Sequence, residues 1–225
     1  MNQTPYVIFV DDDQGIAKSM KFLLDAEKIT SQYFESGEVF LDAIQKQPSL
    51  LEGPGCIFLD IRMKKISGLD VFEELKKYGT DSVMPIIFMT GHGDVPIVTR
   101  VLKEGAIDFL QKPIPGDELL KKVEDYFEIS NNLWSKKQQR ISVEDRLASL
   151  TSKEFLIMKH LYTGESNKDI AEQLGNSVRT VELRRAAIYD KLRVRSVVEM
   201  VRILEGIQLD DKKQAALKSP PRLWS

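Results

Sequence analysis

Short runs of consecutive apolar residues recur through the first half of the chain, without alternating polar positions. Runs of this kind are typical of strands that are covered on both faces of a sheet. Four clear runs lie at residues 6–10, 56–59, 86–89 and 107–110, and a weaker one lies around residues 32–34. The pattern therefore predicts five buried strands.

Between these runs, apolar residues recur every three or four positions, which is the period of an amphipathic helix. The helical sets are Ile16/Met20/Leu23, Val39/Ala43, Leu69/Phe72/Leu75, Val98/Val101/Leu102 and Leu120/Val123/Phe127. Strands that alternate with helices predict an α/β fold, a doubly wound parallel five-stranded domain over residues 1–128. Such sheets place their chemistry just after the carboxyl ends of the strands.

After Leu147 the strand pattern stops and helix start signals appear. Three pairs have the spacing of a capping box: Thr151/Glu154, Ser166/Asp169 and Ser196/Glu199. Ser177 is a fourth expected N-cap. The sequence thus predicts a small all-α domain over residues 148–206, followed by a flexible tail at 207–225.

Residues 129–147 are rich in Asn, Ser, Lys and Gln and form the expected linker. Four apolar residues fall near heptad spacing: Leu120, Val123, Phe127 and Trp134. A helix could therefore continue out of the first domain and pair with a copy of itself. Ser130 and Lys137 interrupt this seam, however, so a solvated linker fits equally well.

The net charge of −2 conceals two halves of opposite sign. Residues 1–128 carry 14 Lys+Arg against 22 Asp+Glu, net −8, and residues 129–225 carry 18 against 12, net +6. A basic half suits a polyanionic partner and an acidic half suits a cation. The single Cys56, the lack of a secretion signal and the lack of a long apolar stretch favour a cytoplasmic protein without a membrane partner.

Polar side chains follow four of the predicted strands. Asp11 and Asp12 follow the first strand, Asp60 the third, Thr90 the fourth and Lys112 the fifth. For any one of these residues alone, the simplest interpretation is an ordinary solvated side chain. Together, three crowded carboxylates call for a hard divalent cation such as Mg²⁺, with Mn²⁺ as a substitute. A carboxylate in such a site can attack phosphorus and form an acyl phosphate.

Residues 5–128 resemble the receiver family of response regulators. The matching motifs are Val10-Asp11-Asp12, Leu59-Asp60-Ile61-Arg62-Met63, Ser67-Gly68, Met89-Thr90-Gly91 and Lys112-Pro113. The resemblance implies that Asp60 is the phosphoacceptor. It also implies that Asp12 is a direct metal ligand, that Asp11 is a ligand through water, and that the Arg62 backbone carbonyl completes the set.

The same resemblance implies a switch that follows phosphorylation. Thr90 would turn its hydroxyl toward the phosphoryl group with room provided by Gly91, Lys112 would pair with that group, and Phe109 would turn inward. The Lys112-Pro113 bond is a candidate cis peptide. Where the family commonly has proline, this chain has Lys64, and the lost φ restraint could loosen the loop that carries Arg62 and reduce metal affinity.

A helix-turn-helix pattern lies in the second domain. Residues 167–174 form a short amphipathic helix, Gly175-Asn176 a turn, and Ser177 caps a second helix that ends near Leu192. Val181, Ile188 and Leu192 share one face of this second helix, and the opposite face carries Arg179, Glu182, Arg185, Ala186 and Tyr189. Arg and Glu can read base edges, while Lys168, Lys191, Arg193 and Arg195 suit phosphates.

Three motifs in residues 148–206 resemble the LuxR-type domain: Leu150-Thr151-Ser152-Lys153-Glu154, Ser166-Asn167-Lys168-Asp169-Ile170-Ala171 and Ser177-Val178-Arg179-Thr180-Val181-Glu182. With the receiver, they indicate a NarL/FixJ-type regulator, and the run from Thr90 to Asp94 favours the FixJ side. The expected DNA-binding residues are Lys168, Arg179, Thr180, Glu182, Arg184, Arg185 and Lys191. Arg184 stands where the family usually has histidine, which could alter a phosphate contact.

The expected function is a two-component response regulator whose partners are a histidine kinase, double-stranded DNA and RNA polymerase. Phosphorylation would assemble a homodimer through charged residues near the fourth helix and fifth strand: Arg100, Lys103, Glu104 and Asp108. It could instead release the DNA-binding domain from an inhibitory contact. Two other functions compete: an output domain that binds protein, and a haloacid-dehalogenase-like phosphohydrolase. The latter needs an Asp two residues after its nucleophile, where this chain has Arg62.

Overall fold

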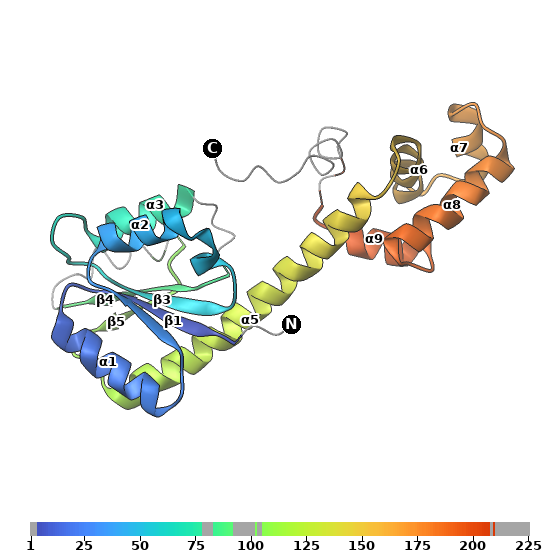
Figure 1. Ribbon diagram of the computed structural model, residues 1–225. Helices are drawn as coiled ribbons and strands as arrows, with labels where there is room; N and C mark the ends of the chain where they lie inside the picture. The colour runs from blue at the N-terminus through green and yellow to red at the C-terminus, as the bar shows by residue number, and fades with distance from the viewer. Residues whose placement is uncertain (1–3, 78–82, 92–101, 103–104, 208, 210–225) are drawn as a thin grey trace. The chain divides into compact units, whose positions relative to one another are not determined.

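The computed structural model describes residues 4–77, 83–91, 102, 105–207 and 209. It divides into two compact units, residues 1–137 and 138–225 (Figure 1). Within the described residues no helix is both long and apolar enough to cross a membrane.

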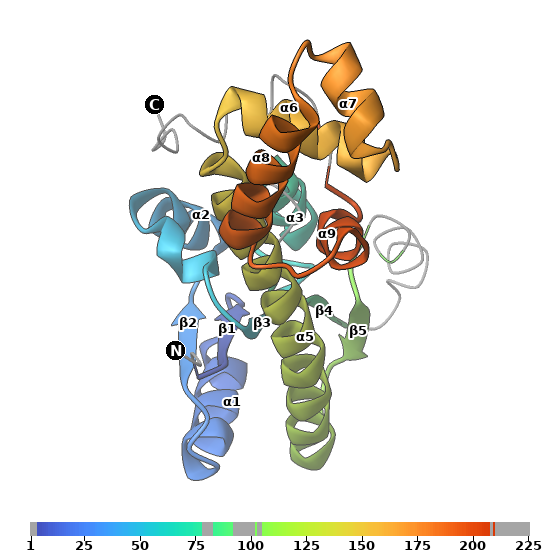
Figure 2. The ribbon, with the colours of Figure 1, turned by 90° about the vertical axis from the view of Figure 1, so that its right-hand side faces the viewer.

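The first unit is built on a parallel sheet of five strands in the order β2-β1-β3-β4-β5 (Figure 2). The strands are β1 (Tyr6–Val10), β2 (Ser31–Phe34), β3 (Gly55–Asp60), β4 (Ile86–Thr90) and β5 (Asp108–Gln111). Every side chain of β3 and β4 is buried, because both strands lie inside the sheet and are covered on both faces. The predicted α/β fold is confirmed.

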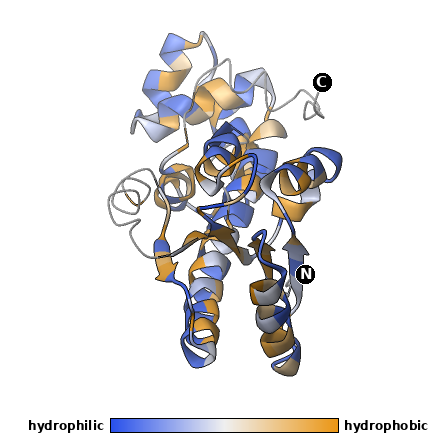
Figure 3. Ribbon diagram, turned by 90° about the vertical axis from the view of Figure 1, so that its left-hand side faces the viewer, coloured by the Kyte–Doolittle hydropathy of each residue, from blue (hydrophilic) through white to orange (hydrophobic). Residues whose placement is uncertain are grey.

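Helices cover both faces of this sheet (Figure 1). The elements are α1 (Gln14–Ala26), α2 (Gly37–Lys46), the short η1 (Pro48–Leu51), α3 (Gly68–Lys77) and the long α5 (Gly116–Ala148). Helices α2 and α3 pack on one face, and α1 with the first turns of α5 on the other, so that two apolar clusters sandwich the sheet. Figure 3 shows the strands as mostly apolar and the helices as mixed. The helix predicted at Val98 and Val101 lies outside the described residues.

Local chemistry fixes the turns that follow the strands. The Asp13 carboxylate accepts hydrogen bonds from Gly15 N and Ile16 N, at 2.8 and 3.2 Å, and so caps α1. Gly68 lies so close to β3 that a Cβ there would stand 2.1 Å from the backbone oxygen of Asp60. Glycine is therefore required where α3 begins.

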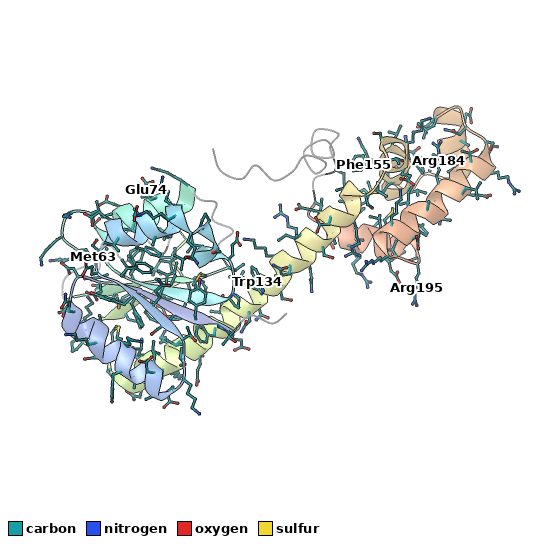
Figure 4. The ribbon with its side chains drawn as sticks, viewed as in Figure 1. Met63, Glu74, Trp134, Phe155, Arg184 and Arg195 are labelled. Atoms are coloured by element: carbon teal, nitrogen blue, oxygen red, sulfur yellow. The ribbon has the colours of Figure 1, made fainter. Side chains whose placement is uncertain are left out.

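Residues 129–147, the expected linker, lie within the continuous helix α5. Ser130 is fully buried, and its hydroxyl accepts a 2.8 Å hydrogen bond from Gly55 N and donates to Val83 O. Trp134 packs against the cluster beneath α2 and α3 (Figure 4). Leu120, Val123 and Phe127 also pack inside the first unit. All four apolar residues thus pack against the two clusters of the first unit, and the solvation considered for Ser130 is wrong.

We predict that Ser130→Ala destabilises the first unit. The change removes the acceptor of Gly55 N at a buried position, which costs about 1 to 3 kcal/mol when the donor finds no other partner. Urea unfolding followed by circular dichroism measures the loss. Ser135→Ala, at an exposed position of the same helix, is the matched control and should change stability little. Equal stability of both variants would show that the buried bonds contribute nothing.

The second unit contains α6 (Ser152–Tyr162), α7 (Asn167–Gln173), α8 (Val178–Leu192) and α9 (Val197–Leu204), packed around one apolar core. The last turns of α5 contribute to this core. The four predicted helices are therefore present.

The predicted N-caps can be compared one by one. Capping boxes form at Thr151 and Ser166, and Ser177 caps α8. At Ser196 only half of the predicted box forms. The Ser196 hydroxyl accepts from Glu199 N, but the Glu199 carboxylate accepts from Arg195 N at 2.7 Å instead.

Candidate functional site

Three carboxylates converge at the carboxyl edge of the sheet. Asp11 and Asp12 directly follow β1, Asp60 ends β3, and one oxygen of each lies within 4.8 Å of the others. Asp11 and Asp60 are buried, whereas Asp12 is half-buried. Oxygen ligands at this spacing fit a hard divalent cation.

Lys112, directly after β5, joins two of these carboxylates. Its Nζ lies 2.7 Å from Asp11 Oδ2 and 3.0 Å from Asp60 Oδ2. Burial raises the pKa of Asp60, although the Lys112 ammonium opposes this. Burial alone would lower the pKa of Lys112, but hydrogen bonds and attraction from Asp11 and Asp60 raise it. The Lys112-Pro113 bond is cis, as expected.

Asp11 has a protein partner at each carboxylate oxygen and at its backbone oxygen. Besides Lys112, Asp13 N donates to its Oδ1 at 2.9 Å, and the Tyr33 hydroxyl donates to its backbone oxygen at 2.7 Å. The contacts of Asp12 are longer: Lys64 N and Lys64 Nζ lie 3.4 and 3.8 Å from Asp12 Oδ2. Asp12 is thus the more accessible of the two for a ligand. The contact of Tyr33 could not be predicted from the sequence, because nothing in the strand pattern marks a hydroxyl that reaches the end of a neighbouring strand.

The loop after β3 contains Lys64, the residue that stands where the receiver family commonly has proline. The Lys64 N–H that contacts Asp12 is a donor that proline would lack. Lys65 takes a left-handed backbone conformation with φ 67, and Ile66 N donates to Lys64 O at 2.9 Å. The backbone N–H of Arg62 donates to Asp60 Oδ1 at 3.4 Å. The loop therefore bends back toward the carboxylates through its own backbone bonds.

The expected switch residues lie on β4 and β5. Thr90 is buried and its hydroxyl donates to Gly91 O at 2.7 Å, while Phe109 is 38% exposed. A Cβ at Gly91 would meet nothing within 4 Å, so crowding does not require glycine there.

Of the four expected dimer-face residues, Arg100, Lys103 and Glu104 lie outside the described residues. The Asp108 carboxylate accepts from Lys122 Nζ at 2.6 Å and from the Tyr126 hydroxyl at 2.7 Å. Burial alone would raise the pKa of Asp108, but these bonds lower it. Asp108 therefore has partners within its own chain.

Helix α8 buries Val181, Ile188 and Leu192, as its pattern predicts. On the opposite face Arg179, Glu182 and Ala186 are exposed, and Leu183, which the sequence analysis did not include, is exposed beside them.

Arg185 and Tyr189 are only half-buried rather than fully outward. The Arg185 guanidinium donates to the Tyr189 hydroxyl at 3.0 Å and to Asn167 Oδ1 of α7 at 3.2 Å, and it lies 5.2 Å from the Tyr189 ring centre. Arg185 thus links the two helices of the helix-turn-helix.

The remaining residues predicted to contact DNA differ in their exposure and in their partners within the unit. Lys168, Arg193 and Arg195 are exposed, and Arg184 is half-buried on α8 (Figure 4). Lys191 is bound inside the unit, with its Nζ 2.6 Å from Glu154 Oε2. The Thr180 hydroxyl lies 2.8 Å from Ser177 Oγ at the start of α8.

Comparison with known families agrees with both units. Residues 7–124 match the response regulator receiver domain, and residues 148–204 match the bacterial regulatory proteins of the luxR family. The LuxR-type match decides against an output domain that binds only protein, and the receiver match decides against a phosphohydrolase of the haloacid-dehalogenase type.

Full-length relatives support the same assignment. The chain is 34% identical over 203 residues to the transcriptional regulatory protein FixJ of Bradyrhizobium diazoefficiens, covering 90% of this chain and 96% of the relative. It is 32% identical to the response regulator protein TodT of Pseudomonas putida, covering 92% and 89%. Among solved structures, the response regulator StyR superposes with a TM-score of 0.76 at 32% identity, covering 90% and 99%. The chain therefore belongs to the response regulators, as a member in which a receiver domain precedes a LuxR-type DNA-binding domain.

Proposed function

We propose that a histidine kinase phosphorylates this protein on Asp60, and that the modified protein dimerises and binds specific DNA sequences to regulate transcription. One observation carries the proposal: the buried Asp60 carboxylate lies 3.0 Å from the Lys112 ammonium and within 4.8 Å of carboxylate oxygens of Asp11 and Asp12. We further propose RNA polymerase as a partner and the cytoplasm as the location, because the target is DNA.

The carboxylates fit Mg²⁺ or Mn²⁺, with Asp12, Asp60 and the Arg62 carbonyl as direct ligands and Asp11 as a ligand through water. Such an ion would neutralise negative charge on the phosphoryl oxygens. An oxygen of Asp60 attacks the phosphorus of phosphohistidine, the P–N bond breaks, and the leaving imidazole takes up a proton. Lys112 holds a positive charge where negative charge develops. Water attack on the same phosphorus returns Asp60 and inorganic phosphate.

The proposed switch uses two residues, Thr90 and Phe109, whose side chains change position when Asp60 is phosphorylated. The Thr90 hydroxyl exchanges its bond to Gly91 O for one to the phosphoryl group. Phe109, now partly exposed, turns inward into the space near Thr90. Both residues border the face that contains Asp108, so the surface of that face changes.

The DNA interface centres on α8. We propose Lys168, Arg179, Thr180, Glu182, Arg184, Arg185 and Lys191 as its residues. Arg179 and Glu182 are exposed near the start of α8 and can reach base edges, and Lys168 can reach a phosphate. Arg185 and Lys191 first have to give up, or share, the bonds to Asn167 and Glu154.

We expect beryllofluoride, a phosphoryl mimic, to convert the full-length protein from monomer to dimer in sedimentation velocity. Each charge pair across the expected face contributes at most about 1 kcal/mol, so the dimer should be switchable rather than permanent. Asp60→Asn is the matched control and should stay monomeric. A wild type that remains monomeric while its DNA affinity rises would instead support release from an inhibitory contact.

A further inference from the structure

Leu183 is the most exposed large apolar side chain described in the second unit, at 65%. Successive residues of a helix are rotated by 100°, so Leu183 lies 200° from the buried Val181. Arg179 precedes it by four residues and Ala186 follows it by three, which places all three on one exposed face. This face contains the side chains that α8 offers to a partner.

The contacts of Arg185 hold its side chain away from the exposed face on which Leu183 lies. The Arg185 guanidinium is drawn sideways to Tyr189 and to Asn167 of α7. The exposed side chains of the first two turns of α8 are those of Val178, Arg179, Glu182 and Leu183, and Leu183 is the more exposed of the two apolar ones, at 65% against 41%. Residues in the first turns of a recognition helix are the ones that reach base edges in the major groove.

Leucine has no hydrogen-bond donor or acceptor in its side chain, so it cannot read the polar pattern of a base pair. The apolar group that the major groove presents is the C5 methyl of thymine. We propose that Leu183 determines part of the operator sequence by contacting a thymine methyl group. This proposal rests on the proposed function of α8 in the DNA interface, and it adds a specific base to that interface.

Phosphorylated full-length protein and its Leu183→Ala variant are each used to select duplexes from a randomised pool. Each thymine of the wild-type site is then replaced in turn by deoxyuridine, which lacks the methyl group. The proposal predicts that one replacement weakens wild-type binding about three- to tenfold, the effect of losing one buried methyl contact. Leu183→Ala should already show that loss, respond no further to the same replacement, and select that position without preference.

Leu156→Ala is the matched control, because Leu156 is a leucine that is 40% exposed on α6 in the same unit. This variant should keep the wild-type site and its response to deoxyuridine. The thermal unfolding midpoint of Leu183→Ala should match that of the wild type, since this side chain is largely solvated, and Leu156→Ala, at a 40% exposed position, should lower the midpoint only slightly.

The outcomes distinguish a failure of the proposed thymine contact from a failure of the proposed DNA interface. If Leu183→Ala keeps the wild-type preference and response to deoxyuridine, Leu183 does not contact a methyl group, although α8 still binds DNA. A loss of dimerisation or transcription with unchanged base preference would likewise overturn the proposal and assign Leu183 to a protein contact. If the wild type selects no sequence at all, the proposed DNA interface is itself wrong.

Discussion

Asp60→Asn will leave the protein without detectable phosphoryl label after incubation with Mg²⁺ and acetyl phosphate, where the wild type takes up one group. The amide keeps the shape of the side chain but lacks the anionic oxygen that attacks phosphorus. Wild-type label should be stable in acid and labile in base, as an acyl phosphate is. Mass spectrometry of the intact protein and radiolabel counting both measure the difference.

An acid in the loop after β1 provides the control. Asp13 caps α1, and asparagine caps helices about as well as aspartate, so Asp13→Asn keeps the fold while it removes one charge near the site. This variant should accept the label. Label that persists in Asp60→Asn would assign the phosphoacceptor to another residue and remove the basis of the proposed function.

Lys191→Ala will destabilise the second unit as well as weaken its binding to DNA. Lys191 Nζ lies 2.6 Å from Glu154 Oε2, and the same oxygen accepts from Thr151 N at 2.7 Å. The Glu154 side chain is only 11% exposed, whereas that of Lys191 is 33% exposed. Removing one partner of a buried pair is costly, and partial exposure reduces the expected loss to about 1 to 3 kcal/mol.

Lys168→Ala is the matched control for Lys191→Ala, because Lys168 is exposed on α7. It should keep the unfolding midpoint and reduce the salt dependence of DNA binding by about one phosphate contact. An unchanged midpoint in Lys191→Ala, with equal loss on specific and random DNA, would show that Lys191 acts on phosphate alone.

The same ion pair makes stability depend on pH. Burial alone would raise the pKa of Glu154, but hydrogen bonds from Lys191 and Thr151 lower it below its ordinary value of 4.5. A lowered carboxyl pKa stabilises the folded state above the ordinary value, and this contribution is lost as the pH falls through the lowered one. Lys191→Ala should therefore flatten the acid limb of a plot of unfolding midpoint against pH.

Much of the fold could be predicted from the sequence because the relevant signals are local. A strand covered on both faces must be apolar throughout, so the buried runs marked β1, β3 and β4 to within a residue or two. The convergence of Asp11, Asp60 and Lys112 followed from parallel topology alone, since such strands end at one edge.

The features that sequence analysis missed depend on partners far away in the chain. Ser130 bonds to Gly55, 75 residues earlier, and Tyr33 bonds to Asp11, 22 residues earlier. A helical projection gives the direction of Arg185 but not that its long side chain reaches sideways to Asn167. The projection also gave no reason to select Leu183. A single exposed leucine is common on protein surfaces, and it points to a function only when its neighbouring side chains are known.

The packing of Ser130 and Trp134 into the first unit bears on where a hybrid regulator can be joined. The receiver match ends at residue 124, yet the packing of the first unit continues along α5 through Trp134. A hybrid protein joined immediately after the matched region would combine the sheet of one parent with the anchoring turns of another, and Gly55 N would depend on a foreign residue for its acceptor. A junction after Lys137 keeps each core with the helix turns that fill it, so gene fusions that preserve this boundary should recombine as intact modules.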